Sequence, residues 1–266
     1  KNDPNVNLIK GDLTELNNKN SINYDYDIIY FLAAIVGVSN VINKPYETIA
    51  GNIALTNEAI KLGKRQKNLK RFMFFSTSEV YSGALNINIA ETPTNESTPL
   101  IIEDIYQNRA TYKLSKITGE MMCINSSLPY SIVRPHNIYG PRMGISHVIP
   151  ELINKILNLK DNDRLPVFSV KHTRTFCYIS DAINMLYEIA GSENTKGQIL
   201  NLGSVGPEIE IGELAKLLCK IADKKLIISE MEEDFGSQKR RRANMNKTLN
   251  LIKFKPNIGL EEGCKL

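Results

Sequence analysis

A tyrosine and a lysine lie four residues apart, at Tyr112 and Lys116, in a stretch with helical periodicity over about residues 108–125. Four residues make about one helical turn, so the two side chains project from the same face. An ammonium beside a phenol stabilises the phenolate and lowers the pKa of the tyrosine. Such a phenolate can take the proton of a substrate hydroxyl while a hydride leaves the same carbon. For this short motif alone, a surface aromatic–lysine pair is the alternative.

A run of hydroxyl groups precedes this helix. Ser76, Thr77, Ser78 and Glu79 follow the apolar stretch 71–75, which predicts a strand. Thr77 is placed to hydrogen-bond the oxygen that Tyr112 deprotonates. A carboxylate at Glu79 is suited to proton transfer. The alternatives are a polar turn or helix cap for the hydroxyl residues, and a carboxylate bonded to loop backbone for Glu79.

Short β-branched or aromatic runs alternate with longer helical stretches along the chain, a pattern typical of a parallel sheet with crossover helices. We predict an α/β fold. The expected strands are 6–9, 27–32, 71–75, 130–134, 167–168 and 198–202, and the expected helices are 46–63, 108–125, 148–159, 180–190 and 211–222.

Polar or small residues stand at the carboxyl ends of these strands, at 11–12, 33–34, 76–79 and 135–137. Parallel sheets bind ligands at that edge. The sequence therefore predicts a ligand site there before any family is considered.

The composition is that of an ordinary globular protein, with 42% hydrophobic and 23% charged residues and a net charge of +4. No apolar run is long enough to span a membrane, and the opening residues contain no apolar signal-peptide segment. The four cysteines are scattered, without CxxC spacing, and the histidines do not cluster with other metal ligands. We expect a cytoplasmic protein without a metal. The basic run 239–242 lacks interleaved aromatic residues, so we expect no nucleic acid and favour an anionic small molecule.

Five motifs in order resemble one family. They are Ser-Thr-Ser-Glu-Val-Tyr at 76–81, Tyr-Lys-Leu-Ser-Lys at 112–116, Arg-Pro-His-Asn-Ile-Tyr-Gly-Pro-Arg at 134–142, Arg-Thr-Phe-Cys-Tyr-Ile-Ser-Asp at 174–181 and Asn-Leu-Gly-Ser at 201–204. The chain resembles, over nearly its whole length, the extended short-chain dehydrogenases/reductases that remodel nucleotide sugars with NAD. The resemblance implies a Rossmann-like, doubly wound parallel sheet in residues 1–140 and about 173–203. It implies a smaller α+β substrate-binding lobe in about 141–172 and 204–266.

The resemblance also implies roles for individual residues. The catalytic residues would be Thr77, Tyr112 and Lys116, with Ser78 and Glu79 beside them. The cofactor-binding residues would be Asp12, Leu32, Ala33, Ala34, Asn52, Ser76, Tyr112, Lys116, Pro135 and Asn137. The substrate-binding residues would be His136, Asn137, Arg142, Arg174 and Arg241, whose guanidinium groups suit a diphosphate.

Two features depart from the family pattern. The glycine-rich turn that holds the cofactor diphosphate in this family is absent, so we expect the N-terminal βαβ unit to lie outside this sequence, in a longer protein; loss of the cofactor site is the alternative. The choice between NAD and NADP stays open, because the residue that meets the ribose hydroxyl would lie in the same unit. Asn244 stands where an acidic residue is usual.

The reaction type is open at this stage. The resemblance implies oxidation of the sugar at C4, followed by epimerisation, dehydration or decarboxylation. The Thr-Ser-Glu motif that ends at Glu79 resembles that of decarboxylases and some 4,6-dehydratases. Segment 135–141 resembles the corresponding segment of epimerases at least as well. A non-catalytic protein that binds nucleotide sugar or NAD on the same scaffold is the alternative. We also expect a homodimer that pairs helices 46–63 and 108–125 in a four-helix bundle. Ile53, Ile60, Ile117 and Met121 could supply its contacts, and burial of these residues within one chain is the alternative.

Overall fold

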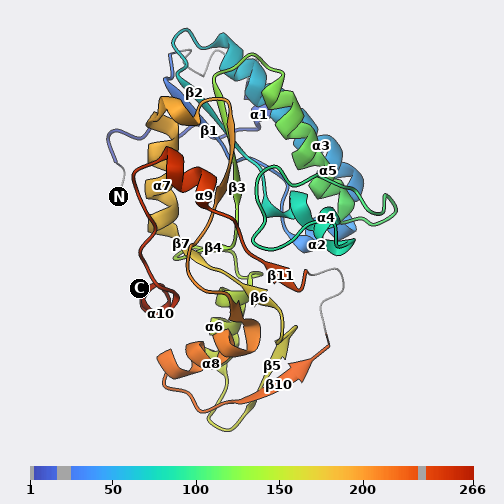
Figure 1. Ribbon diagram of the computed structural model, residues 1–266, viewed down its shortest axis with the longest axis vertical. Coiled ribbons are helices and arrows are strands. Elements are labelled where there is room, and N and C mark those ends of the chain that lie inside the picture. Colours follow the sequence, from blue (N-terminus) through green and yellow to red (C-terminus); the bar gives the residue numbers. More distant parts are fainter. Residues whose placement is uncertain (1–2, 17–24, 233–237) are drawn as a thin grey trace. The chain divides into compact units, whose positions relative to one another are not determined.

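The main sheet has four strands in the order β1–β2–β3–β8 (Figure 1). The computed structural model describes residues 3–16, 25–232 and 238–266. The strands are β1 (Ile28–Phe31), β2 (Arg71–Phe75), β3 (Tyr130–Pro135) and β8 (Gln198–Leu202). β1 and β2 are parallel, with Ile28 opposite Arg71 and Phe31 opposite Phe74. Parallel neighbours require crossover connections, which α3 (Pro45–Arg65) and α5 (Ala110–Ile124) supply. The predicted α/β fold is confirmed.

The chain divides into two compact units. The first contains residues 1–76, 104–132 and 196–198, and the second contains 77–103, 133–195 and 199–266. The strands β3 and β8 contribute residues to both. These limits differ from the domain limits expected from the sequence, so that division stays a prediction.

In the first unit, α3 and α5 lie side by side (Figure 1). It also contains α1 (Leu13–Leu16) and α2 (Val38–Asn43). Proline at the first position of α3 suits a helix start, where no N–H is required. Phe31 packs on Phe72 and Phe74, with ring centroids 6.2 and 5.9 Å apart. Gly119 of α5 has no side chain because an added Cβ would lie 2.5 Å from the Phe74 ring.

The second unit contains mostly short elements. They are η1 (Ser78–Tyr81), α4 (Ser82–Asn86), β4 (Ile138–Tyr139), α6 (Val148–Asn158), β5 (Arg164–Phe168), β6 (Thr173–Arg174), β7 (Cys177–Tyr178), α7 (Ile179–Gly191), η2 (Glu193–Thr195), β9 (Ile209–Glu210), α8 (Ile211–Ile221), β10 (Ile227–Met231), β11 (Arg240–Arg241), α9 (Asn246–Leu251) and α10 (Leu260–Lys265). β11, β6 and β9 form one small sheet, and β10 pairs with β5 in another.

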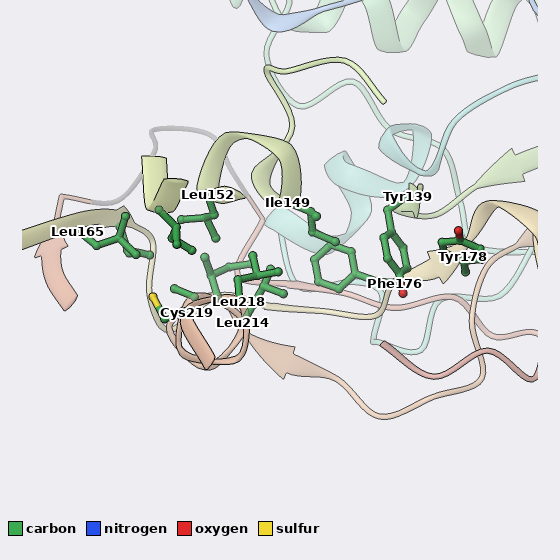
Figure 2. Packing of buried hydrophobic residues seen from close by; sticks show 13 residues of the cluster. Tyr139, Ile149, Leu152, Leu165, Phe176, Tyr178, Leu214, Leu218 and Cys219 are labelled. Carbon is green, nitrogen blue, oxygen red and sulfur yellow. The ribbon is translucent and has the colours of Figure 1, made fainter. Parts of the chain in front are cut away.

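A hydrophobic core fills the second unit between α6, α8 and β5 (Figure 2). Leu152 of α6, Leu165 of β5, and Leu214 and Leu218 of α8 are buried in it. Both helices are amphipathic, so each buries one apolar face. Of the helices in the described ranges, none is long and apolar enough to cross a membrane.

One predicted strand is wrong, and for one residue considered at a dimer contact the alternative, burial within the chain, holds. Residues 6–9 form no strand, and Val6 and Leu8 are 66% and 87% exposed. An apolar run becomes a strand only where a neighbour completes its hydrogen bonds, and no strand in the described ranges pairs with this segment. Ile60, expected at a dimer contact, is buried within the first unit.

Candidate active site

Tyr112 and Lys116 lie on the same face of α5, as the spacing predicts. The Lys116 ammonium nitrogen is 6.0 Å from the centroid of the Tyr112 ring and 5.4 Å from that of Phe74. It donates a hydrogen bond to the carbonyl oxygen of Phe75, at 2.8 Å. The backbone end of β2 therefore holds the lysine beside the phenol.

Burial and one carboxylate set the charge of Lys116. The side chain is 5% exposed, and this burial lowers the pKa of Lys116 to about 8, although the Glu120 carboxylate acts in the opposite direction. Glu120 is itself buried and accepts a hydrogen bond from Ser76 Oγ at 2.5 Å. A lysine with such a pKa stays largely protonated at neutral pH and can stabilise a neighbouring phenolate.

Asn52 of α3 supports the loop that follows β1. Its Oδ1 accepts a hydrogen bond from the backbone N–H of Ile35 at 2.7 Å, and its Nδ2 donates to the Ile35 carbonyl and to Ser115 Oγ. Ala33 in this loop is exposed and Ala34 half-buried, and Leu32 is exposed. A fixed loop with small side chains lets a flat ligand approach the backbone. A role of these residues in binding a cofactor stays a prediction.

Asp12, expected near the adenine, caps a short helix. Its Oδ1 accepts hydrogen bonds from the N–H and the hydroxyl of Thr14, which lower the pKa of Asp12. The side chain is exposed. Its role toward a cofactor stays a prediction.

In the second unit, Thr77 starts a turn that carries Ser78 and Glu79. Thr77 Oγ1 accepts a hydrogen bond from the Glu79 N–H at 3.2 Å and so caps η1. This is the capping role considered from the sequence. The hydroxyl of Thr77 still has its own proton to donate. Ser78 is buried, whereas the Glu79 carboxylate is partly exposed and lies 3.7 Å from Arg241 Nη2.

Two arginines lie close together in this unit, at Arg174 of β6 and Arg241 of β11, on adjacent strands. Arg174 Nη1 donates to the carbonyl oxygens of Thr173 and Lys239. Burial, and then the neighbouring Arg241 charge, lower the pKa of Arg174 to about 9. Arg174 is buried and Arg241 is partly buried, and two such guanidinium groups on adjacent strands favour a bound anion. Gln238, which the sequence analysis missed, accepts a hydrogen bond from Arg241 Nε at 3.1 Å.

The predicted site residues that follow β3 differ in their exposure to solvent and in their hydrogen-bond partners. Asn137 has a positive φ of 44° and donates from Nδ2 to the Thr175 carbonyl, and Arg142 is exposed. His136 is only 1% exposed, and its Nε2 faces Asn201 Oδ1 at 3.2 Å. Burial and the nearby Arg241 and Arg134 charges lower the pKa of His136 to about 3, so its imidazole is neutral. A substrate contact by His136 stays a prediction.

A buried polar network in the second unit was also missed. Its members are Tyr81, Glu96, Arg134 and Asn201. Three of them belong to motifs quoted above, but the sequence does not show that they bond one another.

In the described part of the chain, no group of three or more histidine, cysteine or acidic side chains could hold a metal ion.

The comparison with known proteins decides the family. The model of the NAD dependent epimerase/dehydratase family matches residues 1–203. The chain belongs to this family. This confirms the prediction of an NAD-dependent enzyme of the nucleotide-sugar epimerase/dehydratase family, without specifying which reaction it catalyses.

Proteins similar to the chain include decarboxylases, a 4,6-dehydratase and a 4-epimerase of nucleotide sugars. The chain is 29% identical to a UDP-N-acetyl-alpha-D-glucosaminuronate decarboxylase of Bacillus cytotoxicus, over 98% of this chain and 81% of that protein. It is 28% identical to UDP-glucuronic acid decarboxylase 4 of Arabidopsis thaliana, over all of this chain and 57% of that protein. Among solved structures, a UDP-glucuronic acid 4-epimerase of Bacillus cereus, in complex with UDP-glucuronic acid and NAD, superposes with a TM-score of 0.79. It is 26% identical, over 96% of this chain and 76% of that one.

Proposed function

We propose that the protein oxidises the sugar of a nucleoside-diphosphate sugar at C4, with Tyr112 as the base, and then decarboxylates it. The hydrogen-bonded placement of Lys116 beside Tyr112 carries the proposal. NAD, when bound, would accept the hydride from C4 and return it at the end. Ala33, Ala34, Ser76 and Lys116 would hold it, with Asn52 supporting the loop.

The first unit would supply the acid–base chemistry. The Tyr112 phenolate takes the proton of the C4 hydroxyl as that carbon becomes a ketone, and the Lys116 ammonium stabilises the phenolate. Later, the Tyr112 hydroxyl returns a proton to the same oxygen as the ketone is reduced. Thr77 would donate a hydrogen bond to this oxygen.

The second unit would hold the diphosphate through Arg174 and Arg241. A planar guanidinium can bind two phosphate oxygens at once, and the partial burial of both side chains strengthens the attraction. Asn137 and Arg142 would contact the sugar and nucleotide, as the resemblance implies.

Glu79 and the decarboxylase relatives favour a uronic acid as the substrate. A ketone at C4 makes the C6 carboxylate that of a β-keto acid. Loss of carbon dioxide leaves the electron pair of the C5–C6 bond in an enolate at C4 and C5, and a proton must then be added at C5. Glu79 is partly exposed and near Arg241, so it would serve as the group that handles this proton.

A 4-epimerase of uronic acids is the second candidate. It is favoured by the likeness to the Bacillus cereus enzyme and by the Pro-His-Asn-Ile-Tyr-Gly-Pro segment. It needs no proton transfer at C5, so Glu79 would only compensate the charge of Arg241.

We further propose a homodimer through α3 and α5. Ile53, Ile117 and the exposed Met121 could contact the partner subunit, whereas Ile60 is buried and could not.

Mass spectrometry and chromatography of the full-length protein with NAD and a panel of UDP-, GDP-, CDP- and dTDP-sugars and uronic acids test the proposal. Loss of carbon dioxide would establish a decarboxylase. An unchanged mass with a new chromatographic peak would establish an epimerase, and loss of water a dehydratase. Binding of nucleotide sugars without any conversion would instead support a non-catalytic protein.

A further inference from the structure

Asn201 of β8 is fully buried, and its side-chain amide faces a polar partner at each of its four hydrogen-bonding positions. Oδ1 accepts from the Tyr81 hydroxyl at 2.8 Å and faces Nε2 of His136 at 3.2 Å. Nδ2 donates to the carbonyl oxygens of Thr94 at 2.9 Å and Asn244 at 3.0 Å. Leaving any of these buried groups without its partner is costly. The amide is therefore fixed in one orientation.

Through Tyr81, the oxygen of the amide is connected to the turn that contains Thr77 and Glu79. Tyr81 is the last residue of η1, and Thr77 caps the first turn of the same short helix. Arg134 Nη1 donates to the Tyr81 hydroxyl oxygen at 2.9 Å and fixes the phenol from a second direction. Because η1 is a single turn, holding Tyr81 also sets the direction of Glu79 and Thr77.

The nitrogen side of the amide leads to Arg241. Thr94 forms a parallel bridge with the segment after β11: its N–H donates to the Arg242 carbonyl, and the Asn244 N–H donates to the Thr94 carbonyl, both at 2.9 Å. Asn201 Nδ2 bonds the carbonyls of Thr94 and Asn244, one on each side of this bridge. The amide thus fastens the segment that begins with Arg241 in β11.

Both paths end at one ion pair, because Arg241 Nη2 lies 3.7 Å from Glu79 Oε1. We infer that Asn201 is a positioning residue that aligns the Thr77–Glu79 turn with the diphosphate-binding Arg241. This inference rests on the proposed function for the roles of those residues. It assigns separate tasks to the two ends of one amide: the oxygen aligns groups for turnover, and the nitrogen aligns a group for substrate binding.

Two variants of the NAD-loaded full-length enzyme separate these tasks. Tyr81→Phe removes only the hydroxyl on the oxygen side, so we expect kcat to fall by about tenfold or more, with KM changed by less than about twofold. Asn201→Asp keeps an acceptor for Tyr81 but turns an oxygen toward the carbonyls of Thr94 and Asn244. We expect KM, and the Kd for UDP measured by calorimetry, to rise by about tenfold or more, while kcat changes less than about threefold.

Thr248→Val is the matched control. The Thr248 hydroxyl is equally buried and donates to the backbone carbonyl of Asn201 at 2.7 Å, without touching the amide. It should lower Tm while kcat and KM stay within about twofold of wild type. If Tyr81→Phe and Asn201→Asp likewise lower only Tm, or change kcat and KM together, the inference is wrong. Should Asn201→Asp fail to fold, Asn201→Ser, which cannot bond both carbonyls, should raise the Kd for UDP by about tenfold or more, and an unchanged Kd would overturn the inference.

The UDP titration keeps this test distinct from that of the proposed function. If the wild type converts no sugar, the proposed reaction fails. A rise in the Kd for UDP with Asn201→Asp but not with Tyr81→Phe would still support the alignment of Arg241. Equal Kd values in both variants and the wild type would overturn it, as would a wild type that does not bind UDP.

Discussion

Lys116 donates a hydrogen bond from its ammonium group to the carbonyl oxygen of Phe75, inside a site that excludes most water. Burial lowers the pKa of Lys116 to about 8, against an ordinary value of 10.5. Between these two pH values the unfolded chain binds more protons than the folded chain. The stability contributed by this group therefore rises with pH through that window, and below about pH 8 the folded protein bears the full cost of the buried charge.

The free energy of unfolding should therefore increase more with pH in the wild type than in Lys116→Met, between about pH 8 and 10.5. Urea unfolding at several pH values measures the difference between the two proteins. Lys61→Met, which removes an exposed ammonium paired with Glu58, is the control and should follow the wild type. A difference that does not change with pH would contradict the low pKa.

Tyr112→Phe should reduce kcat by at least about a hundredfold, because a positioned acid–base group supplies that much. The affinities for NAD and nucleotide sugar should stay within a few fold, since the ring remains. Steady-state kinetics and calorimetry measure these values. Tyr106→Phe serves as the control, because Tyr106 is 90% exposed, and it should behave as wild type. Full activity of Tyr112→Phe would contradict the role of Tyr112 as the base.

Arg174→Lys and Arg241→Lys should each weaken UDP binding by about tenfold or more, because lysine cannot bind two phosphate oxygens through a planar fork. The neighbouring Arg240 is the control: it binds the Glu208 carboxylate and is largely exposed. Arg240→Lys should change the Kd by less than about twofold. Calorimetric titration with UDP measures the three Kd values, and equal losses in all three variants would contradict a specific role for Arg174 and Arg241 in binding the diphosphate.

Glu79→Gln separates the two candidate reactions. If the enzyme is a decarboxylase that uses this carboxylate to transfer a proton, kcat for the decarboxylated product should fall by about a hundredfold while NAD is still reduced. If it is an epimerase, the variant should retain turnover within about tenfold, because only the pairing with Arg241 is weakened. Product analysis together with NADH absorbance distinguishes these outcomes.

Gly83→Ala should destabilise the second unit. A Cβ at this position in α4 would lie 2.0 Å from the carbonyl oxygen of Ile101, and backbone cannot yield as a side chain does. We expect the free energy of unfolding to fall by about 1–3 kcal/mol, as for other overpacked sites. Gly191→Ala, where nothing lies within 4 Å of an added Cβ, should leave it unchanged or raise it by up to about 1 kcal/mol. Urea unfolding of both variants tests the contrast.

The sequence predicted the elements whose pattern is set locally. β2 was expected at 71–75 and occupies Arg71–Phe75, because an unbroken apolar run marks a buried strand. The helix of Tyr112 and Lys116 was equally predictable from its periodicity. Residues 6–9 have a similar apolar content, yet strand formation depends on a neighbour that a linear pattern does not specify.

The site was predictable only where a motif holds its residues close together along the chain. Tyr112 and Lys116 are one helical turn apart, and the structure shows them adjacent. Tyr81 and Asn201 are 120 residues apart, and only the fold brings their side chains together. The burial of His136 was missed for the same reason, because its surroundings come from distant segments.

The outer edge of β1 has a practical consequence for handling the protein. Ile28 and Tyr30 of β1 and Leu32 just after it alternate along the chain and are all exposed, and no strand within the described ranges pairs with the outer side of β1. An uncovered apolar edge is a template to which another chain can add. The protein should accordingly self-associate as its concentration rises, and a charged substitution at Tyr30 should improve its solubility.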